Sequence, residues 1–266
     1  GTVGATEGFG AAAIGAGARE EVGGDDDVAR FGELIDHALL HPTLTDAEAE
    51  AGCRMAVAYD IASVCVKPYW VPRAAELLNG TDVIVCCVVG FPAGNSAIEV
   101  KRYETEIACR AGAREIDMVI NVAKAIEGDW DYLEQEIRTL AGEAHKHGAR
   151  LKVIFETDYL TKDETKIKLC EISGRAGADW VKTSTGFGFV RQPDGSLLSR
   201  GATEHDLRLM RRHSPAGVQV KASGGIRDLD GLILVRDLGC TRLGASATKA
   251  ILDEYHKRSA SGEGGD

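Results

Sequence analysis

Eight short apolar runs alternate with eight longer segments of helical character between residues 30 and 258, and this alternation constrains the fold more than any other feature. The apolar runs are the expected strands: Glu33–His37, Ala62–Val66, Val83–Val89, Glu115–Asn121, Leu151–Glu156, Trp180–Ser184, Val218–Ser223 and Thr241–Gly244. The amphipathic segments are the expected helices: Asp46–Ala58, Val71–Leu78, Ser96–Ala111, Tyr132–His147, Lys162–Ala176, Thr203–Arg212, Leu229–Leu238 and Ser246–Lys257. Strand then helix, repeated eight times, predicts an α/β fold, namely a (β/α)8 TIM barrel.

The two ends of the chain differ in composition from the part between them. Residues 1–29 are rich in Gly and Ala and then acidic, so we expect a disordered tail there, and residues 259–266 look the same. No linker or composition shift divides residues 30–258. We therefore expect that span to form a single domain.

Composition excludes several classes of partner. The formal charge of −10 leaves no basic excess to pair with phosphates, so we expect no nucleic-acid partner. No apolar run approaches the ~20 residues that a membrane span needs, and the N-terminus lacks the layout of a signal peptide. The seven cysteines lack zinc-type spacing and the histidines are scattered, which favours reduced core thiols and no bound metal. These features predict a cytoplasmic protein that contacts no membrane.

Side chains alternate along several of the expected strands. In the run 115–121, Ile116 and Met118 share one face, whereas Glu115 and Asp117 share the other. An antiparallel sheet with one wet face gives the same pattern, but the helices between the strands argue against it. In a barrel, the apolar face meets the helices and the polar face points inward, with the active site at the carboxyl ends of the strands.

Two lysines near the ends of apolar strands need an explanation, because a buried ammonium is unfavourable unless it is paired or neutralised. Lys182 lies in the run 180–184, and Lys221 lies at the matching place in the run 218–223. We interpret Lys182 as a Schiff-base lysine and expect Lys221, two strands round the barrel, to lower its pKa. The alternative is a pair of lysines that extend to the barrel rim.

With these residues placed, the chain closely resembles the deoxyribose-phosphate aldolase family. The resemblance rests on segments that span the folded body in order: Ile35–Leu40, Ser63–Val66, Val89–Pro92, Glu115–Asn121, Lys152–Thr157, Val181–Phe187, Val220–Arg227 and Leu243–Ser246. It implies a class I aldolase without metal or other cofactor. Such an enzyme reversibly cleaves 2-deoxy-D-ribose 5-phosphate into acetaldehyde and D-glyceraldehyde 3-phosphate.

The motif match also assigns roles to residues. It makes Lys182 the Schiff-base lysine, and Asp117 and Lys221 the pair that handles protons. Asp117 also has a plain reading as a buried counter-ion for Lys221, and the two roles are compatible. Asp36 is expected either to hydrogen-bond substrate hydroxyls or to orient Lys221. Three positions depart from the family pattern: Ala38, His41 and Phe187, the last of which is expected to weaken contact with the phosphate.

The remaining candidate residues belong to the two ends of the substrate. Glycine loops after the last two strands suit a phosphate, because backbone N–H groups can approach an anion there, although each glycine alone could simply serve a tight turn. The expected phosphate residues are Gly186, Gly224, Gly225, Arg227, Gly244 and Ser246. Leu40 and Cys65 are expected to close the acetaldehyde pocket, and Thr185 to touch the substrate. Cys65 is read first as a small core residue, and alternatively as a thiol that reactive aldehydes can trap.

Two rival functions remain open at this point. One is another Schiff-base aldolase or transaldolase acting on a different sugar phosphate. The other is a phosphate-binding barrel without turnover, which predicts no covalent trapping. A homodimer or a higher homo-oligomer is expected, although no surface patch can be read from the sequence.

Overall fold

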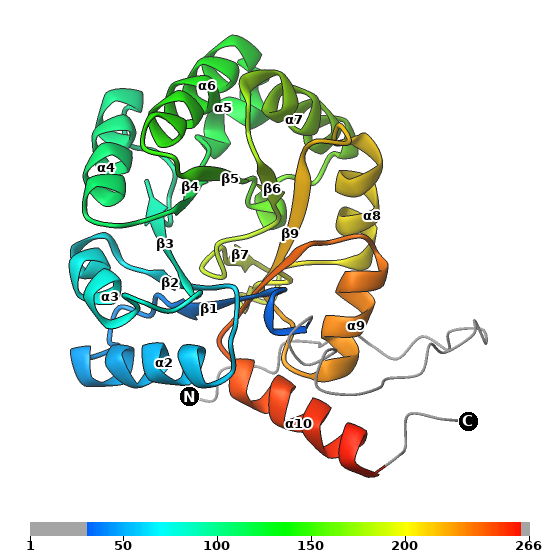
Figure 1. Ribbon diagram of the computed structural model, residues 1–266. Helices are drawn as coiled ribbons and strands as arrows, with labels where there is room; N and C mark the ends of the chain where they lie inside the picture. The colour runs from blue at the N-terminus through cyan, green and yellow to red at the C-terminus, as the bar shows by residue number, and fades with distance from the viewer. Residues whose placement is uncertain (1–30, 262–266) are drawn as a thin grey trace.

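The computed structural model describes residues 31–261 of the chain (Figure 1). The predicted tail 1–29 lies outside the described residues, as do residues 262–266 of the predicted tail 259–266. Eight parallel strands close into a barrel: β1 (Ile35–Leu39), β2 (Ser63–Val66), β3 (Ile84–Val89), β4 (Glu115–Val119), β5 (Arg150–Ile154), β6 (Trp180–Lys182), β9 (Gln219–Ser223) and β10 (Arg242–Ala245). The order round the barrel is β1-β10-β9-β6-β5-β4-β3-β2, so the predicted TIM barrel is confirmed.

Helices form a ring outside these strands (Figure 1). They are α2 (Asp46–Ala58), α3 (Val71–Leu77), α4 (Ile98–Arg110), α5 (Val122–Glu127), α6 (Trp130–Lys146), α7 (Asp163–Ala176), α8 (Glu204–His213), α9 (Leu229–Asp237) and α10 (Thr248–Ser261), with short 3-10 turns η1 (Pro68–Trp70) and η2 (Thr157–Tyr159). The last helix continues past residue 258, where the sequence places the end of the domain. No helix among residues 31–261 combines the length and the apolar composition that crossing a bilayer requires.

Several elements differ from the prediction. The first strand is Ile35–Leu39 and not Glu33–His37. A hairpin of two-residue strands, β7 (Val190–Arg191) and β8 (Leu197–Leu198), stands between β6 and α8 outside the barrel. The helix α5 was also missed; Asn121 caps its start by accepting from the backbone N–H of Lys124.

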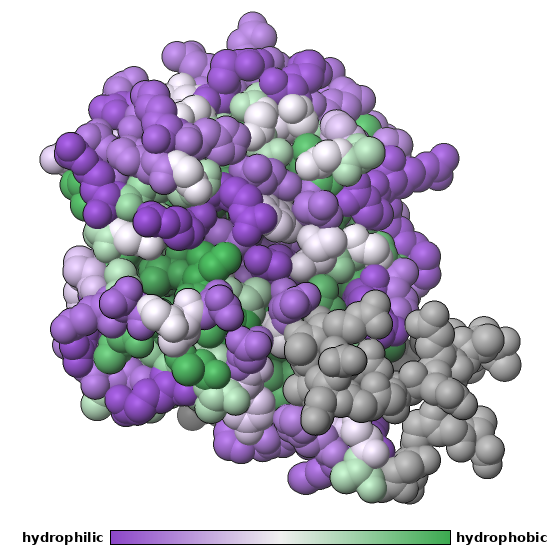
Figure 2. Space-filling model, in the orientation of Figure 1, coloured by the Kyte–Doolittle hydropathy of each residue, from purple (hydrophilic) through white to green (hydrophobic). Residues whose placement is uncertain are grey.

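The alternation along the strands places apolar residues outside and polar residues inside, as predicted. Ile116 and Met118 are fully buried in one continuous apolar cluster that also holds Leu133 and Ile137 of α6. A second, smaller apolar cluster lies apart from it and contains Leu40, Cys65, Cys86 and Val88. On the face shown in Figure 2, hydrophilic residues cover the helical rim, and hydrophobic residues show between them toward the middle of the view.

The register between strands decides which inward side chains meet. Lys182 pairs directly with Lys221, because β6 and β9 are neighbours in the barrel. The expected separation of two strands between these lysines was therefore wrong. Asp117 of β4 likewise pairs with Lys152 of β5.

Candidate active site

A cluster of charged side chains fills the inside of the barrel. It consists of three carboxylates and four cations: Asp36, Glu115, Asp117, Lys152, Lys182, Lys221 and Arg242. The three carboxylates and Lys152 are inaccessible to solvent, and Lys182 and Lys221 are nearly so. Charges so deeply buried persist only when they are paired, so their mutual geometry determines what the site can do.

Asp117 is the centre of this cluster. Its Oδ2 accepts from Lys182 Nζ at 2.7 Å and from Lys221 Nζ at 2.8 Å. Its Oδ1 accepts from Lys152 Nζ at 3.0 Å and from the Cys86 thiol at 3.1 Å. Burial alone would raise the pKa of Asp117, but attraction from the three lysines outweighs it and holds that pKa well below its usual range.

Asp36 holds Lys221 from the other side. Its Oδ2 accepts from Lys221 Nζ at 2.6 Å, and its Oδ1 accepts from the Ser63 hydroxyl at 2.7 Å. Burial would lower the pKa of Lys221, but attraction from Asp117 and Asp36 raises it above its ordinary value. Of the two roles expected for Asp36, this geometry matches the orientation of Lys221.

Three further charged residues, Glu115, Lys152 and Arg242, contact this part of the site. None of them was predicted to belong to it. Lys152 Nζ contacts Asp36 Oδ2 at 3.3 Å and also donates to Glu115. Arg242 bridges Asp36 Oδ1 and Glu115 Oε1, each at 3.1 Å. The available signal was the strand alternation, because Glu115 and Lys152 share the inward phase of their strands. Burial would raise the pKa of Asp36, but attraction from Lys152, Lys221 and Arg242 outweighs it and holds that pKa below its ordinary value.

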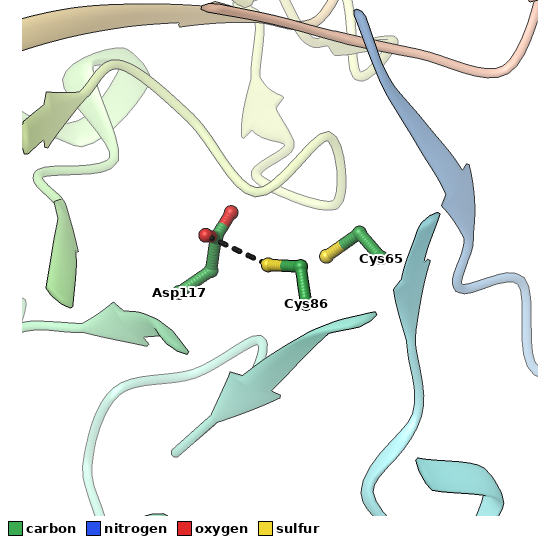
Figure 3. Close-up of side chains that lie close together, drawn as sticks. All are labelled: Cys65, Cys86 and Asp117. Atoms are coloured by element: carbon green, nitrogen blue, oxygen red, sulfur yellow. Dashed lines mark hydrogen bonds between the residues drawn. The ribbon is translucent and has the colours of Figure 1, made fainter. Parts of the chain in front are cut away.

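Cys65 and Cys86 face the inside of the barrel next to Asp117 (Figure 3). They belong to the small apolar cluster with Leu40 and Val88, against which Phe91 and Phe187 pack. The two phenylalanine rings meet edge to face, with centroids 5.5 Å apart. Leu40 and Cys65, predicted to line a donor pocket, are thus brought together beside the charged cluster.

The two thiols differ in acidity. A hydrogen bond with Cys86 lowers the pKa of the Cys65 thiol, whereas burial raises the pKa of the Cys86 thiol well above its ordinary value. The thiolate is the reactive form of cysteine, so Cys65 is the more reactive of the pair. Cys65 is almost completely buried, however, as its first reading as a small core residue expects.

The candidate phosphate residues lie at the carboxyl ends of the strands. Gly186, Gly224 and Gly225 have φ values of 84°, 89° and 86°, a left-handed conformation that favours glycine. A side chain on Gly224 would also meet the backbone of Gly201 at 2.9 Å. Gly225, Arg227 and Ser246 are exposed. Exposed glycine backbone beside a cation is an arrangement that an anion can approach.

Two other candidate residues, Gly244 and Thr185, also have close contacts with neighbouring residues of the protein. A Cβ on Gly244 would meet Ser223 Oγ at 2.8 Å and Lys221 Cε at 3.3 Å, so this glycine leaves room for the lysine. The Thr185 hydroxyl donates to the buried carboxylate of Glu156 and accepts from the Phe187 N–H at 2.9 Å. These two hydrogen bonds fix the loop after β6, and the expected contact of Thr185 with the substrate stays a prediction.

Among residues 31–261, two groups of side chains come close enough to suggest metal ligands: Cys65, Cys86 and Asp117, and Asp163, His205 and Asp206. In the first group, ammonium groups of three lysines already contact the carboxylate of Asp117. In the second, Lys166 Nζ lies 3.0 Å from Asp163 and also contacts Asp206. In each group, a lysine ammonium therefore already lies where a metal ion would contact the carboxylates.

Acid is expected to destabilise the fold through Asp36 and Asp117. Both pKa values lie below the ordinary value of 3.8, because the cations of the cluster favour the carboxylates. The stabilisation is therefore complete above about pH 4 and is lost as the pH falls below that value. Urea midpoints measured from about pH 6 to about pH 3 test this. Asp36→Asn should flatten the decline, and an unchanged slope in that variant contradicts the assignment.

Comparison with known proteins gives one consistent result. Residues 33–240 match the family described as DeoC/LacD family aldolase. The deoxyribose-phosphate aldolase of Rhodopirellula baltica is 46% identical over 226 residues, covering 85% of this chain and 89% of that protein. The one from Caldanaerobacter subterraneus subsp. tengcongensis is 44% identical over 235 residues, covering 88% and 97%. The solved tetrameric deoxyribose phosphate aldolase from Aeropyrum pernix has a TM-score of 0.75 at 28% identity, covering 88% of this chain and 98% of its own.

Proposed function

The chain belongs to the DeoC/LacD family of aldolases, and from that premise we propose that it is a deoxyribose-phosphate aldolase. The reaction is the reversible cleavage of 2-deoxy-D-ribose 5-phosphate into acetaldehyde and D-glyceraldehyde 3-phosphate. We assign the Schiff base to Lys182, and the transfer of protons to Asp117 and Lys221. The match in sequence supports the reaction, and the geometry of the charged cluster supports the roles.

One observation carries the assignment of the nucleophile, namely the number of carboxylates that each buried lysine contacts. The inside of the barrel holds three buried carboxylates and three buried lysines, and the more exposed Arg150 and Arg242 also contact Glu115. Within the described residues, Lys152 contacts three of the carboxylates, Lys221 contacts two, and Lys182 contacts Asp117 alone. Lys182 thus has the fewest anionic partners of the three lysines, and we assign it as the nucleophile. A neutral amine is the form that attacks a carbonyl.

The chemistry follows from these positions. The Lys182 amine attacks the aldehyde carbon of the open-chain sugar, and Asp117 at 2.7 Å is placed to accept its proton. Loss of water from the carbinolamine leaves an iminium, which draws electrons from the bond between C2 and C3. Removal of the proton from the C3 hydroxyl breaks that bond and releases glyceraldehyde 3-phosphate. Protonation of the resulting enamine and hydrolysis then return the amine and acetaldehyde.

The two ends of the substrate fit the two surroundings of Lys182. The two-carbon fragment is small and apolar, which suits the apolar side chains of Leu40, Cys65 and Phe91. The phosphate suits the exposed glycines of the last loops and the Arg227 side chain. Phe187 closes the apolar side, and the phosphate is then held mainly by backbone N–H groups.

Reduction with borohydride in the presence of acetaldehyde tests the proposed function. We expect a stable ethyl group on the peptide that contains Lys182, together with cleavage of deoxyribose 5-phosphate. A Schiff-base aldolase for another sugar phosphate would be trapped but would leave this substrate intact. A phosphate-binding barrel without turnover would show neither result, and an unmodified Lys182 refutes the mechanism.

We further propose that the protein is a cytoplasmic homo-oligomer that needs no metal. The tetrameric state of the Aeropyrum pernix relative supports the assembly, and light scattering of the purified protein measures it. We expect a mass of at least two chains. We also expect full activity after dialysis against a chelator, because the iminium itself accepts the electrons of the broken bond.

A further inference from the structure

We propose that a buried ion pair outside the barrel, Lys101 with Glu136, positions Phe91 and thereby sets the size of the pocket for the aldehyde donor. This inference rests on the proposed function. Lys101 belongs to α4 and Glu136 to α6, and both side chains are completely inaccessible to solvent. Neither touches the charged cluster inside the barrel within the described residues.

The ammonium of Lys101 makes three short contacts, one for each of its N–H groups. Its Nζ donates to Glu136 Oε1 at 2.6 Å, to the Val119 carbonyl at 2.8 Å and to the Gly94 carbonyl at 2.5 Å. Gly94 belongs to the loop between β3 and α4, and Val119 is the last residue of β4. The lysine therefore ties this loop to the end of the strand that carries Asp117.

The loop is held at both of its ends. The N–H of Gly90 donates to Glu104 Oε2 of α4 at 2.8 Å, and the N–H of Gly94 donates to the Gly90 carbonyl at 2.8 Å. A Cβ on Gly90 would lie 2.7 Å from Lys101 Cε, so the stem of the lysine packs directly against the loop. The next two residues after Phe91 are exposed, so the anchoring comes from these contacts with α4.

Phe91 is the loop residue that reaches the candidate pocket. It packs against the apolar cluster of Leu40, Cys65, Cys86 and Val88, and its ring meets Phe187 edge to face. A shift of the backbone between Gly90 and Gly94 therefore moves one wall of the pocket. Larger donors would then fit beside the apolar cluster.

The same pair also fixes the end of β4. The second oxygen of Glu136 accepts from the Asn121 N–H at 3.0 Å. Burial opposes the charged form of both partners, since it lowers the pKa of Lys101 and raises the pKa of Glu136. An apolar pair of similar volume is often as stable as a buried ion pair. What the charged pair adds is a set of directed hydrogen bonds to backbone groups near the site.

The test compares Lys101→Met with Lys166→Met. Lys166 is also buried and paired, but its partners Asp163 and Asp206 lie on α7 and α8, away from the pocket. The readout is the preference in kcat/KM for acetaldehyde over propanal as donor, with glyceraldehyde 3-phosphate as acceptor. One extra methylene in a tight pocket changes such a preference by about 10- to 200-fold.

We expect Lys101→Met to reduce the preference by roughly tenfold, mainly through a higher KM for acetaldehyde. Lys166→Met should lose stability in urea but keep the wild-type preference. Glu136→Gln, which preserves volume, should shift the preference in the same direction if Lys101→Met does not fold. A wild-type preference in the folded Lys101 and Glu136 variants overturns the inference, as does an equal shift in Lys166→Met.

Measurements on the wild-type protein distinguish failure of the proposed function from failure of this inference alone. If borohydride traps no acetaldehyde on wild-type Lys182, then the proposed function fails and the inference falls with it. If the wild type is trapped and prefers acetaldehyde, but Lys101→Met keeps that preference, then only the role of the ion pair is wrong.

Discussion

Lys182→Ala is expected to lower the turnover of deoxyribose 5-phosphate by about 10⁴-fold or more, because it removes the atom that forms the covalent intermediate. The fold should persist, since Asp117 keeps Lys152 and Lys221 as partners. Steady-state kinetics measure the loss, and circular dichroism with urea unfolding measures the fold. Borohydride should attach no ethyl group to the corresponding peptide.

One outcome would contradict this prediction. If Lys182→Ala retains a rate near that of the wild type, then another amine is the nucleophile. Peptide mapping after reduction would identify that amine, and the assignment of Lys182 from its few anionic partners would be wrong. A variant that loses both activity and folding is separated from this case by the urea measurement.

Asp117→Asn is expected to produce the second-largest effect, in both activity and stability. Loss of a positioned group that transfers protons lowers the rate by about 10²- to 10⁴-fold. The change also leaves three buried lysines facing an amide, and breaking a buried ion pair destabilises by about 3–5 kcal/mol. Kinetics and the free energy of unfolding in urea measure the two losses separately.

Glu115→Gln is the matched control for this variant. Glu115 is another fully buried carboxylate of the same cluster, but it contacts Lys152, Arg150 and Arg242 and not Lys182. We expect it to lose stability to a similar degree and to keep much more activity. Equal losses of activity in the two variants would mean that Asp117 acts only as a counter-ion.

The eight strands and the inward direction of the polar residues could be predicted because both depend on local pattern. Asp117, Lys152 and Lys221 each alternate with aliphatic neighbours, and a buried face strictly fixes the period of a strand. Family membership and fold were confirmed. The first strand was placed two residues early, because Glu33 and Leu34 precede Ile35 without any turn signal.

Other features could not be predicted, because they depend on contacts between distant segments. The strands β7 and β8 have two residues each, too short for any alternation to appear. The bridging by Arg242 requires Asp36 and Glu115 to meet across the barrel, and no spacing in the sequence encodes that meeting. For the same reason, the hydrogen bond from the Thr185 hydroxyl to Glu156 could not be predicted.

The hairpin β7–β8 has a consequence for engineering. It lies in the segment between Lys182, the last residue of β6, and Gln219, the first residue of β9. The strands β6 and β9 pair directly with each other. Lengthening a surface loop carries a small entropic penalty, about 0.6 kcal/mol for each doubling of the loop length. The turn between β7 and β8 can therefore be lengthened, while the alignment of the two lysines stays fixed by the pairing of β6 with β9.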